Sequence, residues 1–113
     1  MATNNTPLNT FKNESYELTT TPTLIYTTPT GVTTIVLGAM ASNFGNNPAT
    51  IRFVLNKNST DFILLNDFEI PDHDAAEVTT SKLVLEEGSY IEASASLDNT
   101  INLVFSILET SNE

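Results

Sequence analysis

Apolar and polar residues alternate with a period of two along much of this chain, and no segment repeats apolar residues with the 3.6-residue period of a helix. The clearest alternation runs over residues 101–108. Its two faces are Ile101, Leu103, Phe105 and Ile107 on one side, and Asn102, Val104, Ser106 and Leu108 on the other. Because side chains alternate between the faces of a strand, this segment predicts a strand with one core face. The second face is mixed, as expected of a strand that a neighbouring subunit partly covers.

Seven other segments have the composition of short strands and are separated by turn-forming residues. They are residues 24–28, 33–42, 50–55, 62–65, 76–80, 82–85 and 91–97. About eight short strands with this spacing predict an all-β fold, namely an antiparallel, jelly-roll-like β-sandwich, with a closed barrel as the alternative. Gly38 interrupts the segment 33–42 and is expected to mark a β-bulge.

Two pairs of neighbouring strands are expected to form hairpins. Residues 50–55 and 62–65 flank an Asn-Lys-Asn-Ser turn, and residues 91–97 and 101–108 flank an Asp-Asn turn. Residues 1–13 are mostly polar and include Pro7. We therefore expect residues 1–13 to form an N-terminal arm and residues 14–113 to form a single sandwich domain.

The charge and composition argue against several classes of protein. Fourteen acidic residues stand against four basic ones, for a formal net charge of −10, whereas nucleic-acid binding needs clustered Lys and Arg. The chain has no cysteine for a disulfide or a thiolate metal site. No run approaches the roughly 20 apolar residues of a membrane helix, and the N-terminus does not have the pattern of a secretory signal. We expect no nucleic acid and no membrane among its partners.

No constellation of catalytic side chains is evident, so we expect a protein that is not an enzyme and that needs no cofactor. The only histidine, His73, lies between Asp72 and Asp74. Adjacent residues of an extended segment point in alternate directions, which favours a solvated polar turn over a metal site. Glu86 and Glu87 are also adjacent, and so are not placed to converge across a cleft as paired catalytic carboxylates do.

The aromatic residues predict a core and one exposed anchor. Tyr26, Tyr90 and Phe105 lie at strand positions, where aromatic side chains usually pack in the core or against a neighbouring strand. Phe44 differs because it directly precedes the sequence Gly-Asn-Asn-Pro at 45–48. An aromatic residue at a loop tip could anchor an interface.

Four motifs follow one another along the chain. They are Thr23-Leu24-Ile25-Tyr26-Thr27-Thr28-Pro29, Thr34-Ile35-Val36-Leu37-Gly38, Lys82-Leu83-Val84-Leu85-Glu86-Glu87-Gly88 and Phe105-Ser106-Ile107-Leu108-Glu109. In this order they resemble a family of small virion structural proteins of tailed phages, especially phages of marine bacteria and cyanobacteria. The resemblance covers residues 9–109. Two positions depart from the pattern: residues 72–74 replace small residues and glycine, and Ser89 replaces an acidic residue.

The resemblance implies a virion component that is assembled in the host cytoplasm. The most specific role that the resemblance implies is that of a head decoration, or cement, protein. Such a protein would bind the major capsid protein or another virion structural protein. A tail, collar or baseplate protein of the same particle is the alternative. A carbohydrate-binding module for host attachment is a third hypothesis. Capsid accessory proteins are often symmetric oligomers, so we expect self-association, as a trimer.

The expected contacts with a partner lie in the arm and in one loop. The candidate partner-binding residues are Phe11, Lys12, Phe44, Asn46, Asn47 and Pro48. An arm that adds a strand to an exposed sheet edge would satisfy unpaired backbone groups. We accordingly expect deletion of residues 1–13 to abolish binding to the particle and to leave the fold intact.

Overall fold

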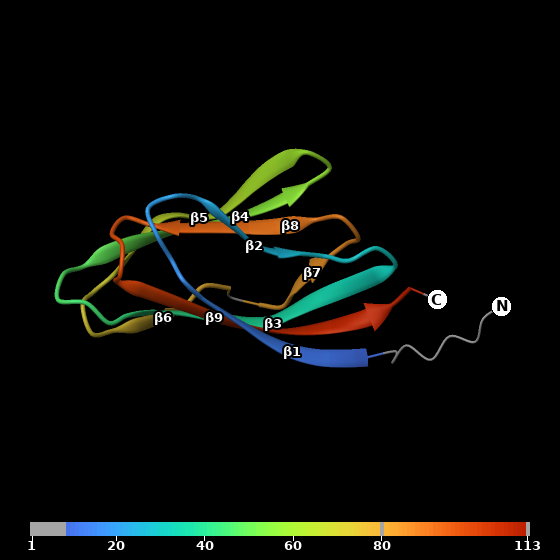
Figure 1. The fold of residues 1–113 in the computed structure, drawn as a ribbon, viewed down its shortest axis with the longest axis horizontal. Helices are drawn as coiled ribbons and strands as arrows, with labels where there is room; N and C mark the ends of the chain where they lie inside the picture. The colour runs from blue at the N-terminus through green and yellow to red at the C-terminus, as the bar shows by residue number, and fades with distance from the viewer. Residues whose placement is uncertain (1–8, 80, 113) are drawn as a thin grey trace.

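The computed structural model describes residues 9–79 and 81–112, which form nine strands in two antiparallel sheets (Figure 1). The strands are β1 (Asn9–Glu17), β2 (Thr23–Thr27), β3 (Val32–Asn43), β4 (Ala49–Lys57), β5 (Thr60–Ile70), β6 (Ala75–Glu77), β7 (Leu83–Leu85), β8 (Tyr90–Ala95) and β9 (Ile101–Ser111). Sheet A has the order β1-β9-β3-β6, with β7 also paired to β3, and sheet B has the order β2-β8-β4-β5. Most connections cross from one sheet to the other, as in a jelly roll. The expected all-β sandwich is confirmed.

The core lies between the two sheets and follows the period-two alternation. All four residues expected on the inner face of residues 101–108 are buried, at 1% exposure or less. Ile51 and Phe53 of β4 and Ile91 of β8 face them from sheet B and are fully buried. The rings of Tyr26 and Phe105 meet edge to face across the core, with centroids 6.3 Å apart. Burial of these side chains holds the sheets together, at about 1.5–3 kcal/mol for each large one.

The connections between strands agree in part with the expected turns. The β4–β5 hairpin is confirmed, and Asn58 and Ser59 at its turn both have positive φ, of 55° and 64°. Two consecutive residues with positive φ match the right-handed twist of the flanking strands. The hairpin projects beyond the body of the sandwich in Figure 1. The bulge at Gly38 is confirmed too, because the β3–β9 register shifts between Val36 and Gly38.

The expected hairpin of residues 91–97 with 101–108 is wrong. β8 pairs with β2 and β4 in sheet B, whereas β9 pairs with β1 and β3 in sheet A. Each strand has an apolar face, and the two faces bury each other when they stand on opposite sides of one core. The free energy gained by this burial exceeds what a hairpin between β8 and β9 through their short turn would contribute. The connection is held by Asp98, whose Oδ1 accepts a 2.9 Å hydrogen bond from the amide of Thr20.

The boundary of the N-terminal arm also needs correction. Residues 9–13 are the first half of β1, which pairs with β9 in nine consecutive positions from Asn9↔Thr110 to Glu17↔Asn102. An edge strand exposes much of its surface, so it can be polar, and this is why its composition resembled an arm. Residues 1–8 lie outside the described residues. Deletion of residues 1–13 would therefore remove part of sheet A, and a test of an arm has to stop at residue 8.

Candidate interaction surface

A row of apolar side chains crosses the outer face of sheet A, the face turned away from the core. Val84 of β7 pairs with Ile35 of β3, Ile35 pairs with Leu108 of β9, and Leu108 pairs with Phe11 of β1. Directly opposite residues of antiparallel strands point to the same face, so these four side chains form one line, the apolar row. Phe11 is 72% exposed and Val84 is 57% exposed. A free sheet face is usually polar, so the apolar row makes this face a candidate surface for a partner.

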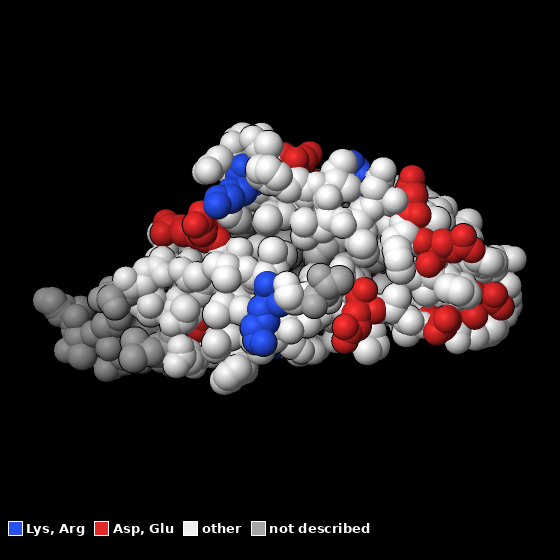
Figure 2. Space-filling model, turned by 180° about the vertical axis from the view of Figure 1, so that it is seen from behind, with Lys and Arg blue, Asp and Glu red and all other residues white. Residues whose placement is uncertain are grey.

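The same face carries further apolar side chains and few charges. Met40 pairs with Val104, and these two residues are 51% and 40% exposed. The bulge at Gly38 separates this pair from the apolar row, and the surface is hollowed beside it. Glu17 and Glu77 share the face through their partners Asn102 and Met40, but both belong to the outer strands of the sheet. Figure 2 views the sandwich from the side rather than onto this face, and the acidic side chains seen there are most numerous toward one end.

Lys12 lies on the opposite, inner side of sheet A, paired with the buried Ile107, and has a structural partner there. Its Nζ lies 3.1 Å from Oε1 of Glu109, and Oε2 of Glu109 accepts a 2.5 Å hydrogen bond from the hydroxyl of Tyr26. The same hydroxyl lies 2.8 Å from Oγ1 of Thr34. Burial, and next the neighbouring Glu109 carboxylate, raise the pKa of Tyr26 far above its usual value. Lys12 therefore takes part in a polar cluster that joins the two sheets.

The loop after β3 holds Phe44 in an exposed position, with 47% of its surface accessible. Asn43, only 2% exposed, organises this loop through its side chain. Its Nδ2 donates to the carbonyls of Asn47 and Ile70, at 2.9 and 3.0 Å, and its Oδ1 accepts from the amide of Gly45 at 2.9 Å. The expected loop tip is thus a fixed turn that presents an aromatic side chain to solvent.

The two groups of candidate residues lie far apart. Phe11 is level with Leu108 near one end of β9, whereas Asn43, next to Phe44, is level with Ile101 at the other end. Seven residues of strand separate these levels, or about 23 Å at roughly 3.3 Å per residue. The remaining loop candidates, Asn46, Asn47 and Pro48, are all exposed on the Phe44 side. The structure therefore presents two separate apolar positions rather than one combined site.

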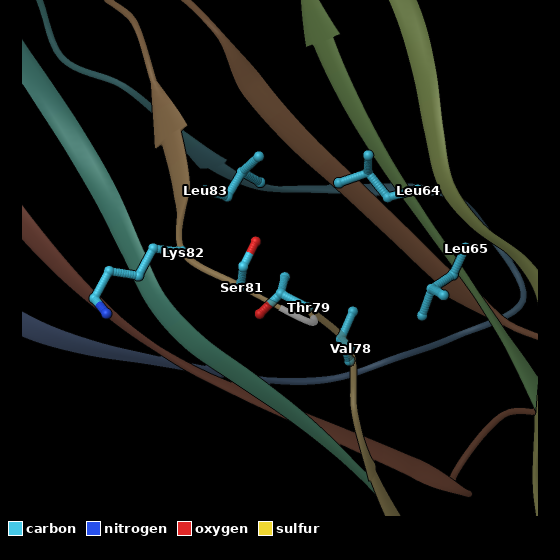
Figure 3. Close-up of a pocket in the computed structure, with 7 residues that line it drawn as sticks. All are labelled: Leu64, Leu65, Val78, Thr79, Ser81, Lys82 and Leu83. Carbon is cyan, nitrogen blue, oxygen red and sulfur yellow. The ribbon is translucent and has the colours of Figure 1, made fainter.

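A hollow of about 250 Å³ opens between the edge of sheet B and the segment that joins β6 to β7 (Figure 3). Its lining residues are Leu64, Leu65, Val78, Thr79, Ser81, Lys82 and Leu83. The buried hydroxyl of Thr79 has no hydrogen-bond partner within the described residues. The side chain of Lys82 points away from the leucines. An apolar lining with two hydroxyl groups offers little to orient a substrate.

The predicted turn at His73 is confirmed. His73 has a φ of 59° and an exposed side chain, and its Nε2 lies 3.9 Å from Asp72 Oδ2. Within residues 9–79 and 81–112, no group of three or more His, Cys, Asp or Glu side chains could hold a metal ion. The part of the chain that the structure describes also contains no helix long and apolar enough to cross a membrane.

Sequence reasoning found Phe11 but missed most of the surface around it. In residues 101–108, Val104 and Leu108 lie on the face opposite the core face. Their apolar character therefore indicated a surface outside the core. Ile35, Met40 and Val84 gave no such signal. Each looks like an ordinary strand residue, and only the register shows which face it occupies.

Comparison with known proteins was informative at the level of the fold. No protein-family model and no curated protein sequence matches this chain. A solved structure of Bacillus endospore appendages, described as a novel family of disulfide-linked pili, contains a chain similar to this one with a TM-score of 0.57 and 10% identity. That similarity covers 100% of this chain and 97% of the other.

The acidic stable capsid structure of Helicobacter pylori bacteriophage KHP30 contains a second similar chain. Here the TM-score is 0.54 and the identity is 10%, over 95% of this chain and 90% of that chain. At this identity the two comparisons show a shared fold. Because both cover nearly the whole length of each chain, the likeness extends to the complete sandwich.

Proposed function

We propose that this chain is a structural component of a tailed-phage virion, and specifically a decoration protein on the outside of the head. The observation that carries the proposal is the whole-length similarity to a chain in a phage capsid structure, which leaves 10% or less of either chain unmatched. The resemblance of the sequence to small virion proteins supports the same role. The proposed partner is the major capsid protein or another virion structural protein.

The outer face of sheet A supports this role physically. A domain of net charge −10 is repelled by other acidic surfaces, yet this face is apolar in its middle and acidic only at the outer strands. Interfaces between proteins are depleted in charge and contain exposed aromatic anchors, which Phe11 provides. We propose that the apolar row contacts the capsid and that Phe44 supplies a second contact about 23 Å away along the sheet.

A tail, collar or baseplate position in the same particle is the second candidate, since one fold serves many structural roles. A pilus subunit of the disulfide-linked kind is disfavoured, because this chain has no cysteine. A carbohydrate-binding module would need aromatic side chains gathered beside polar groups. Phe11 and Phe44 are too far apart to hold one sugar, and the chain has no Trp.

The deciding experiment is cryo-electron microscopy of purified particles that contain this protein, with its copy number measured by quantitative mass spectrometry. Hundreds of copies over the head lattice are expected. About a dozen copies at the tail or neck would favour the second candidate, and absence from the particle would overturn the proposal.

A binding assay tests the proposed surface. Heads stripped of this protein are mixed with purified variants, and occupancy is measured by sedimentation. We expect the double variant Phe11→Ser/Val84→Thr to bind at least ten-fold more weakly than the native protein. The matched control is Phe62→Ser, which removes another exposed phenylalanine from the β4–β5 hairpin, where Phe62 is 49% exposed. Equal loss in both variants would contradict a role for the outer face.

A further inference from the structure

The free edge of β1 is the most regular sheet edge in the described part of the molecule. β1 pairs with β9 through nine consecutive positions, and it contains no proline and no shift of register. The other long edge strand, β5, has register shifts at two places, and bulges twist an edge away from further pairing. The edge strand β2 is five residues long and lies between Pro22 and Pro29. β1 has none of these protective features.

The charges along β1 are complementary to those of the same strand running in the opposite direction. Lys12 and Glu14 flank Asn13, the central residue of β1. When two copies of β1 run antiparallel with Asn13 opposite Asn13, Lys12 of each copy lies opposite Glu14 of the other. A shift of the centre to Lys12 or to Glu14 would place two like charges directly opposite each other, which is unfavourable. Charge therefore selects a single register among these.

Both charged groups are at least partly accessible at this edge. The side chain of Lys12 is 47% exposed although it touches Glu109. Glu14 makes no ion pair within residues 9–79 and 81–112. Directly opposite residues share one face of the extended sheet, so the two opposite charges would point the same way.

We propose that β1 is a self-association edge, at which two copies of this chain pair antiparallel about a two-fold axis through Asn13. Sheet A then continues from one copy into the other. The axis is perpendicular to the sheet, so the outer faces of both copies lie on the same side. Phe11 then lies opposite Ser15 of the second copy, which places the apolar row of one copy level with the Val104–Met40 pair of the other. This pairing replaces the expected trimer, because antiparallel pairing of identical strands requires a two-fold axis.

The inference concerns the purified protein and does not depend on the proposed role in a virion. An edge of nine residues buries less than the roughly 1,000 Å² of a stable interface. We therefore expect a weak, concentration-dependent dimer that is reinforced when many copies are held on one surface. Chemical trapping is the suitable test for such a complex.

The test uses an introduced cysteine, which is unique because the chain has none. In Asn13→Cys the two new thiols face each other across the axis, at the 4.5–5.5 Å Cα separation of opposed residues, within the range of a disulfide. The matched control is Ser15→Cys, another exposed position of β1, where the two thiols are about 13 Å apart along the strand and out of reach. Both variants are oxidised at several concentrations and analysed by intact mass, after circular dichroism shows native strand content.

We expect covalent dimers of Asn13→Cys to form at least ten-fold faster than those of Ser15→Cys. Adding Glu14→Lys should slow the reaction of Asn13→Cys, and adding Lys12→Glu as well should restore it. Equal rates for the two cysteine variants would overturn the proposal. So would a trimeric mass of the native protein, or a dimer unaffected by Glu14→Lys, which would indicate pairing through another surface or with a different strand.

Discussion

The hydroxyl of Tyr26 in β2 donates a 2.5 Å hydrogen bond to Oε2 of Glu109 in β9, and this bond joins sheet B to sheet A at one end of the sandwich. Glu109 also contacts Lys12 of β1, and Tyr26 also contacts Thr34 of β3. Three strands of sheet A are thus linked to one strand of sheet B through polar atoms. The cluster gives the open end of the core a specific geometry that apolar packing alone does not provide.

Replacement of Tyr26 by phenylalanine should destabilise the fold. The variant keeps the ring in the core but leaves Glu109 and Thr34 without their shared partner. Loss of a hydrogen bond to a charged group costs about 1.5–3 kcal/mol. The measurement is urea unfolding followed by circular dichroism. Tyr90→Phe is the matched control, because the Tyr90 hydroxyl makes no hydrogen bond within the described residues, and an equal loss in both variants would contradict the role of the cluster.

Stability should fall at alkaline pH because of the same residue. Burial, followed by the hydrogen bond to Glu109, raises the pKa of Tyr26 in the folded protein. In the unfolded chain a tyrosine loses its proton near pH 10, so above about pH 10 the unfolded state binds fewer protons than the folded state. The contribution is therefore fully present below pH 10 and decreases as the pH rises beyond it. Chemical unfolding from pH 8 to 11 should show this decrease, and Tyr26→Phe should show less of it.

The Phe44 loop should depend on Asn43. Asn43→Ala removes the donor to the carbonyls of Asn47 and Ile70 and the acceptor for the amide of Gly45. A buried group left unpaired costs roughly 1–3 kcal/mol, and only the bond to Ile70 is fully buried while the other two are part-buried, so we expect a loss of about 2–4 kcal/mol in the free energy of unfolding. Calorimetry of the variant gives this value. Asn47→Ala, which keeps the main-chain carbonyl at the same place, should stay within about 0.5 kcal/mol of the native protein.

Two glycines should respond in opposite ways to the same substitution. Gly88 has a φ of 84°, in the left-handed region that disfavours a side chain, so Gly88→Ala should destabilise the fold by about 1 kcal/mol. Gly38 has no positive φ, and a Cβ there meets nothing within 4 Å. Gly38→Ala should therefore leave thermal stability unchanged or raise it slightly. An equal loss at both positions would show that backbone conformation is not the cause.

The candidate surface was predictable only in part. Phe11 and Phe44 stand out in the sequence because an aromatic residue lies in a polar setting, and both are exposed in the structure. Val84 and Ile35 belong to apolar segments that look like core. Ile35 reaches the outer face because β3 pairs with β9 in one particular register, and Val84 because β7 pairs with β3 in one particular register. A shift of one residue in either pairing would have turned that side chain inward.

The sequence by itself determined every strand except β1, and the core face of residues 101–108, since alternation reflects contacts that each strand makes along its own length. It placed Ile101, Leu103, Phe105 and Ile107 in the core and fixed the β4–β5 turn at Ser59. Only the tertiary structure decided which strands pair. β8 and β9 lie in opposite sheets because their apolar faces bury each other, and residues 9–13 join sheet A because β9 offers them an edge. These choices depend on contacts between residues far apart in the chain, which local patterns do not encode.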